Sequence, residues 1–234
     1  MDQRRPPEYI LEVFADPTCV KDIVRGAHSS ITQYYVRGNK LTELGILHAI
    51  FFHRYFPPLR PSSREVLDLT LPFVADPELE TLIDTRVGQL VRQLSSTSSP
   101  KSIRGQLAVQ FFEKRRRKGG GLGWFTGAGK GEEEVCWEIW CLEITLATPR
   151  TEAGILDPSI AEGSEKSAEY IIERAKVIKA MGSTLQRTAM KIVTIVNRDK
   201  DHIPPITTSE TNPFPYQIVL NPRLEGWGKS IGIF

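Results

Sequence analysis

Residues 135–147, with the sequence VCWEIWCLEITLA, constrain the fold of this chain more than any other segment. They are rich in aromatic and β-branched residues and contain no glycine or proline, which is typical of a β-strand. Because side chains alternate along a strand, Trp137 and Ile139 are predicted on one face. Cys136 and Trp140 are predicted on the other. A strand that is apolar on both faces is expected in the middle of a sheet, covered on both sides or partly covered by a partner.

Residues 164–197 carry the longest helical pattern. Apolar positions recur at alternating steps of four and three, as in a helix that lays one stripe on a sheet or on another helix. The predicted stripe consists of Ile171, Ala175, Ile178, Gly182, Leu185, Ala189, Ile192 and Val196. Gly182 weakens such a helix by about 1 kcal/mol relative to alanine unless close packing requires it.

Shorter patterns surround these two segments. Strands are predicted at residues 9–15, 66–74, 106–112 and 214–222, and helices at residues 46–56 and 77–94. The strands and helices follow one another in mixed order, and no internal repeat is found. We therefore predict an α+β fold, formed as a single domain over residues 1–234.

The composition excludes several classes of protein. Hydrophobic residues make up 40% and charged residues 25%, as in ordinary globular domains. The net charge of +2 gives no whole-protein attraction to nucleic acid or membranes. The chain has no apolar run of membrane-spanning length and no signal-peptide pattern, and its three cysteines argue against a disulfide framework. These features predict a cytoplasmic protein without a transmembrane segment.

The glycine-rich region does not match a nucleotide-binding loop. In a P-loop, Gly-Lys is followed by serine or threonine, but Gly131 follows Gly129 and Lys130 here. Trp124 stands where the first glycine of that motif belongs, and a strand rather than a helix follows. No G-x-S-x-G nucleophile motif occurs either.

The spacing of histidines and cysteines does not favour a metal site. His48 and His53 are five residues apart on a predicted helix, so they do not share a face. Cys136 and Cys141 are five apart on a predicted strand and are expected on opposite faces. We therefore expect no metal, no cofactor and no catalytic residues. This shifts the prediction from an enzyme to an interaction module.

Residues 119–131 form a loop with seven glycines in thirteen positions, and it carries the adjacent pair Trp124 and Phe125. If both rings folded back onto the domain, each would gain roughly 1.5–3 kcal/mol from burial. Alternatively, the loop is an exposed finger that offers two large apolar side chains to another protein. The loop has no other apolar residues except Leu122 and Ala128, which favours exposure.

A basic run precedes this loop. It consists of Lys114, Arg115, Arg116, Arg117 and Lys118. One interpretation is an anion-binding site for nucleic acid or anionic lipid. The other is electrostatic: if residues 106–117 and 132–146 pair as a hairpin, the run lies near three glutamates at residues 132–134 and supports the base of the loop. Both interpretations remain open at this point.

Several segments together resemble the autophagy-related protein 101 family. They are FFEKRRRK, the loop with its Trp–Phe pair, CWEIWCLEITL, the helix GSTLQRTAMKIVTIVNRDKDHIPPI, PYQIVL, YILEVF and ILHAIFFHR. The resemblance implies a HORMA domain, with a mixed sheet, long helices packed on it and a C-terminal segment along the sheet. In the family the aromatic pair is separated by one residue, whereas Trp124 and Phe125 are adjacent.

The resemblance also implies a function. Members of the family are non-catalytic subunits of the autophagy-initiation kinase complex. They pair with the HORMA domain of autophagy-related protein 13 and stabilise it, and their Trp–Phe finger recruits downstream autophagy factors. By this resemblance, Trp124 and Phe125 are the partner-binding residues, and the protein acts at the phagophore (preautophagosomal) assembly site.

Two segments interrupt the similarity. Removing residues 27–45 joins CVKDIVRG to ILHAIFFHR in a register that resembles the first helix of the family. Residues 154–172 form a second candidate interruption. We hypothesise that one or both are lineage insertions or intervening sequence retained in the gene model, which sequencing of the transcript tests.

Overall fold

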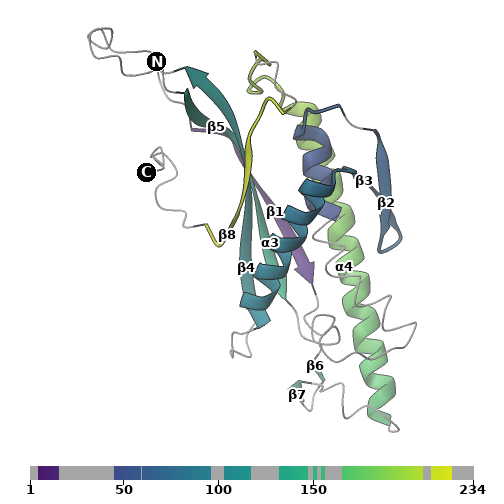
Figure 1. Ribbon diagram of the computed structural model, residues 1–234. Helices are drawn as coiled ribbons and strands as arrows, with labels where there is room; N and C mark the ends of the chain where they lie inside the picture. Colours follow the sequence, from purple (N-terminus) through teal and green to yellow (C-terminus); the bar gives the residue numbers. More distant parts are fainter. Residues whose placement is uncertain are drawn as a thin grey trace, which may run out of the picture.

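A four-stranded mixed sheet with helices packed on one face forms the body of the protein (Figure 1). The structure is a computed structural model. It describes residues 5–15, 45–58, 60–95, 103–116, 132–146, 150–151, 154–155, 165–207 and 212–222. This arrangement confirms the predicted α+β class.

The strand order in the sheet is β1-β5-β4-β8. β1 (Glu8–Ala15) runs parallel to β5 (Glu132–Leu146). β4 (Ile103–Arg116) is antiparallel to β5, and β8 (Tyr216–Leu220) is antiparallel to β4. β5 therefore has a neighbour on each side, which confirms the central position predicted from its two apolar faces.

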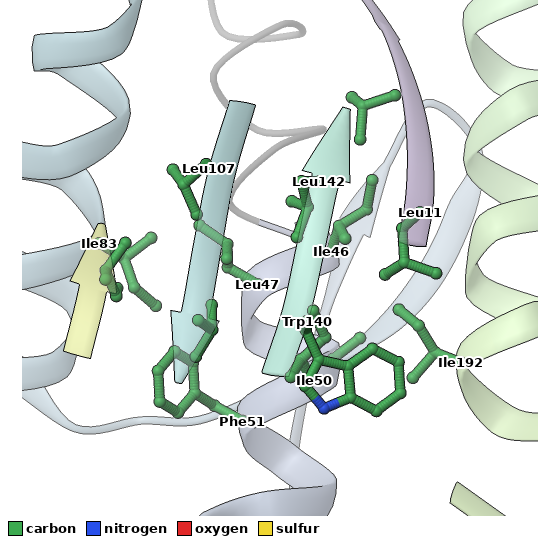
Figure 2. Packing of buried hydrophobic residues seen from close by; sticks show 14 of the residues in the cluster. Leu11, Ile46, Leu47, Ile50, Phe51, Ile83, Leu107, Trp140, Leu142 and Ile192 are labelled. Atoms are coloured by element: carbon green, nitrogen blue, oxygen red, sulfur yellow. The ribbon is translucent and has the colours of Figure 1, made fainter. Parts of the chain in front are cut away.

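Within the described residues, three helical segments cover one face of this sheet. They are residues 45–54, α3 (Pro77–Ser95) and α4 (Glu165–Arg198). The core lies between the two layers, where Phe51 from the first helical segment belongs to the same buried cluster as Leu107 and Leu142 from the sheet (Figure 2). Among the described helices, none is both long and apolar enough to cross a membrane.

Two small antiparallel pairs complete the described strands. β2 (Ser62–Val66) pairs with β3 (Leu69–Phe73), and β6 (Arg150–Thr151) pairs with β7 (Gly154–Ile155). The prediction of one strand over residues 66–74 was wrong, because Leu67 and Asp68 form the turn between β2 and β3. Their φ angles are 48° and 63°, the left-handed conformation of a tight hairpin turn. No glycine marks this turn in the sequence.

The long helix is confirmed, but its buried stripe is only partly the predicted one. The buried residues of α4 are Met181, Leu185, Thr188, Ile192, Ile195 and Val196. Ala175 is exposed, because the N-terminal half of α4 runs beyond the end of β1 (Figure 1). A methyl group added at Gly182 would meet nothing within 4 Å, so close packing does not require this glycine.

A β-bulge in β5 overturns two predictions about the faces of this strand. Phe111 pairs with Glu138 and Phe112 pairs with Cys136, so Trp137 is the extra residue. In a bulge two consecutive side chains point to similar sides, which places Trp137 in the helix-covered core. Cys136 therefore packs with Cys141 in one cluster on the other face of the sheet, although the two cysteines were predicted on opposite faces of the strand.

The outer edge of β1 is covered by side chains from α4. Lys191 Nζ donates to the Ile10 carbonyl O at 2.7 Å, and Thr188 Oγ1 donates to the Glu12 carbonyl O at 2.8 Å. These contacts satisfy carbonyl groups that an edge strand otherwise leaves for another chain.

Candidate interaction site

The β4–β5 hairpin extends beyond the rest of the sheet and carries the candidate finger. The pairing of β1 with β5 starts at Ile139, and the pairing of β8 with β4 ends at Phe111. Residues 112–116 and 132–136 continue as a two-stranded ribbon, which we call the stalk. Five strand residues span about 15 Å, so the described end of the stalk, at residues 116 and 132, lies roughly that far from the base of the hairpin.

Opposite charges face each other across the stalk. The register pairs Lys114 with Glu134, Arg115 with Glu133 and Arg116 with Glu132. Arg115 also forms an ion pair with Glu113 on its own strand. The hairpin on which the electrostatic interpretation of the basic run depended is therefore present, and Lys114 and Arg115 each stand opposite a glutamate.

The remaining predicted site residues lie outside the described residues. These are Trp124 and Phe125 of the finger, and Arg117 and Lys118 at the end of the basic run. Residues 27–44 of the first proposed insertion also lie outside them. Within the second, residues 165–172 belong to α4.

The bulge residue Trp137 fixes the base of the stalk to the body. Its ring lies 5.2 Å from the ring of Phe214, and 5.7 Å from the rings of both Phe111 and His202, measured between centroids. Only 5% of Trp137 is exposed. The base of the stalk is therefore anchored by a large buried ring.

Next to Trp137, the fully buried Glu138 joins three parts of the chain. Its Oε1 and Oε2 accept from Arg54 Nε at 2.8 and 2.9 Å. Its Oε2 is also 2.7 Å from His202 Nε2, and Trp140 Nε1 donates to Oε1. All three partners occupy the carboxylate oxygens, so Glu138 holds the sheet, the helical segment 45–54 and the residues after α4 together rather than serving as a free base.

Sequence reasoning did not identify Glu138 or Arg54. The available signal was a single charged residue inside the apolar run WEIW of the central strand. A buried carboxylate at such a position needs a charged or hydrogen-bonding partner, but the sequence does not show which residue supplies it.

Tyr9 extends this network to the start of β1. Its ring lies 4.7 Å from that of Trp140, and burial together with a hydrogen bond to Asp199 raises its pKa. Hydrogen bonds from Arg198 and then from Tyr9 lower the pKa of Asp199 to about 2. The beginning of β1 and the end of α4 are thus connected through polar contacts.

The described cysteines and His48 have a packing role. Burial raises the pKa of Cys136 to about 11 and that of Cys141 to about 12, so both thiols are protonated and weakly nucleophilic at neutral pH. His48 stacks on Phe73 with ring centroids 3.9 Å apart, and burial followed by the charge of Arg64 lowers its pKa to about 4. The part of the chain that the structure describes holds no group of three or more metal-ligating residues.

The outward face of α4 carries exposed apolar side chains. Met190 is 60% exposed and Val193 is 40% exposed, and they lie three residues apart on the face away from the sheet. Met190 is the most exposed of the large apolar side chains that the structure describes.

Comparison with known proteins gives two kinds of match. A family model described as autophagy-related protein 101 matches residues 36–210. Autophagy-related protein 101 of Arabidopsis thaliana is 26% identical over 185 residues, which cover 75% of this chain and 77% of that protein. Autophagy-related protein 101 of Schizosaccharomyces pombe is 26% identical over 184 residues, which cover 78% of this chain and 80% of that protein.

Proposed function

Because the chain belongs to the autophagy-related protein 101 family, we propose that it is a non-catalytic adaptor in the initiation of autophagy. In this role its fold is a HORMA domain that forms a heterodimer with the HORMA domain of autophagy-related protein 13 and stabilises it. The pair acts within the autophagy-initiation kinase complex, in the cytoplasm and at the phagophore assembly site.

The proposed recruitment of downstream factors depends on Trp124 and Phe125. The observation that carries this proposal is the stalk, which begins the finger about 15 Å from the sheet. A loop that starts at this distance has less of the body within reach for burying its own aromatic rings. Large aromatic side chains at the tip of such a loop are suited to fill a pocket on another protein.

For the heterodimer, the face of α4 with Met190 and Val193 is the proposed contact surface. Its apolar side chains are exposed in the single chain, and burial against a partner would remove them from water. α4 is fixed to the sheet by Thr188 and Lys191, so this face is presented on a rigid element.

Co-purification with the HORMA domain of autophagy-related protein 13 from the same organism tests the heterodimer. We expect a one-to-one complex in size-exclusion chromatography with mass detection. Met190→Glu combined with Val193→Glu should abolish this complex, whereas Thr81→Glu with Thr85→Glu on the exposed side of α3 should retain it. Two separate peaks for the well-folded parent chain would contradict the proposed partner.

Replacing Trp124 and Phe125 with alanine tests the finger separately. If the rings are exposed, the free energy of unfolding should change by less than about 0.5 kcal/mol, and the heterodimer should persist. A loss of several kcal/mol would mean that the rings belong to the core, and the finger would then be rejected.

The alternative function is binding of nucleic acid or anionic lipid through residues 114–118. It predicts binding that weakens steeply with salt and depends on the basic run rather than on Trp124. The glutamates that face Lys114 and Arg115 across the hairpin favour the adaptor over this alternative.

A further inference from the structure

We infer that the stalk, residues 112–116 and 132–136, is an electrostatically held support that positions the finger, and that Lys114 and Arg115 are positioning residues within it. This inference rests on the proposed function of Trp124 and Phe125 as the finger. It assigns the basic residues of the stalk an internal role, in which their partners are carboxylates of the same hairpin.

The first observation is the isolation of the stalk from the other strands. At its base the Phe112 N–H donates to the Pro215 carbonyl O at 2.8 Å, and the Ile139 N–H donates to the Pro7 carbonyl O at 3.0 Å. Beyond these two bonds, no described strand pairs with residues 113–116 or 132–136. A two-stranded ribbon without further neighbours is marginally stable in water.

The second observation is what the two strands offer each other. Lys114 faces Glu134 and Arg115 faces Glu133, while Arg115 also pairs with Glu113. Opposite charges at directly facing positions stabilise an antiparallel pair, and like charges there destabilise it. Because neighbouring positions on a strand point to opposite faces, these two pairs support both faces of the stalk.

The third observation is the fixed base. Trp137 is buried among Phe111, His202 and Phe214, and Glu138 beside it is held by Arg54. A bulge bends a strand and increases its twist, so this anchored bulge sets the direction in which the stalk leaves the sheet. Because the base is fixed, the stability of the stalk depends on the charge pairs between its own two strands.

Hydrogen exchange of backbone amides in the full-length chain tests this inference without any partner. In Lys114→Glu with Arg115→Glu, glutamates face Glu134 and Glu133, and exchange in the stalk should be about tenfold faster. Exchange in residues 107–111 and 139–142, inside the four-stranded sheet, should stay unchanged. Lys179→Glu with Arg60→Glu makes the same change in net charge at two exposed positions and should leave the stalk unaffected.

A charge-swapped variant supplies the decisive comparison. Adding Glu133→Lys and Glu134→Lys to the reversed variant restores opposite charges with inverted sign, and slow exchange should return. Lys114→Arg with Arg115→Lys should exchange as the parent does. Raising the salt concentration from about 0.05 to 0.5 M should accelerate exchange in the parent stalk but not in the sheet.

Three outcomes would overturn the inference. Equal exchange in the parent and reversed stalks would show that the charge pairs do not hold it. Failure of the swapped variant to recover would show that charge complementarity is not the cause. The third concerns phosphatidylserine vesicles. If the parent binds them and the swapped variant does not, although its stalk amides exchange slowly, Lys114 and Arg115 would be assigned to an external anion instead. None of these results depends on Trp124 and Phe125, so failure of the proposed finger remains distinguishable.

Discussion

Arg54 Nε lies 2.8 Å from Glu138 Oε1, and the two residues are 84 positions apart in the chain. Only 3% of the arginine side chain and none of the glutamate side chain is exposed. The pair connects the helical segment 45–54 to the central strand. Arg54 also donates to the Asp199 carbonyl O at 3.2 Å, which adds the end of α4 to the same contact.

Breaking this pair from one side should be strongly destabilising. Arg54→Ala leaves a buried carboxylate without its cation, and the free energy of unfolding should fall by about 3–5 kcal/mol. Arg54→Met combined with Glu138→Leu removes both charges and should be less destabilised than the single variant. Urea denaturation measures both. A double variant as unstable as Arg54→Ala would contradict this account of the pair.

The N-terminus of α3 gives a second prediction. Asp76 Oδ1 accepts from the Glu78 N–H at 2.9 Å and the Leu79 N–H at 3.1 Å, and Oδ2 accepts from the Tyr55 hydroxyl at 2.8 Å. Asp76→Ala should lower the free energy of unfolding by about 1–2 kcal/mol, whereas Asp76→Asn should cost less because it keeps a cap. Glu80→Ala, in the same turn, is the matched control. Equal losses for Asp76→Ala and Glu80→Ala would argue against capping.

A third prediction concerns pH and His48. Burial lowers the pKa of His48 to about 4, so the folded protein keeps the ring neutral where the unfolded chain binds a proton. Between about pH 6.5 and 4 the free energy of unfolding should therefore fall as pH falls, by up to roughly 3 kcal/mol from this residue. In His48→Phe this contribution to the pH dependence of the free energy of unfolding should be absent. Chemical denaturation of the parent and of His48→Phe at pH 7 and pH 5 measures this contribution. If both proteins lose the same free energy of unfolding between the two pH values, His48 is excluded as the cause.

Two glycines give predictions of opposite sign. A methyl group at Gly105 would lie 3.0 Å from Leu94 Cδ2 and 3.1 Å from Leu90 Cδ1, because α3 packs closely on β4 there. Gly105→Ala should therefore cost about 1–2 kcal/mol of stability. Gly182→Ala meets no neighbour within 4 Å and should add about 1 kcal/mol by favouring the helix. Thermal unfolding of the two variants should shift in opposite directions.

Local pattern was sufficient for much of the fold. The capped helix from Pro77, the long helix to Arg198 and the central position of β5 were all predictable from periodicity and from Asp76. The hairpin of β4 and β5 was also predictable, because opposite charges flank a glycine-rich loop. The structure of these elements is determined largely by residues that are close together in the sequence.

Features that depend on a single backbone irregularity were not predictable. The turn at Leu67 and Asp68 has no glycine, and the bulge at Trp137 has no sequence signature. One extra residue was enough to exchange the faces of Trp137 and Cys136. The Glu138 network was missed for another reason, since its partners Arg54 and His202 come from distant parts of the chain.

The covered edge of β1 has a consequence for how the chain folds as it is synthesised. β1 precedes its partners in the chain: its strand partner begins at Ile139 in the register, and the hydroxyl that meets the Glu12 carbonyl O comes from Thr188, 176 residues later. Since domains of this kind fold only when distant segments are available, β5 and α4 must both leave the ribosome before the backbone groups of β1 have their partners. Until then its apolar face and open edge are the surfaces that a chaperone would have to shield.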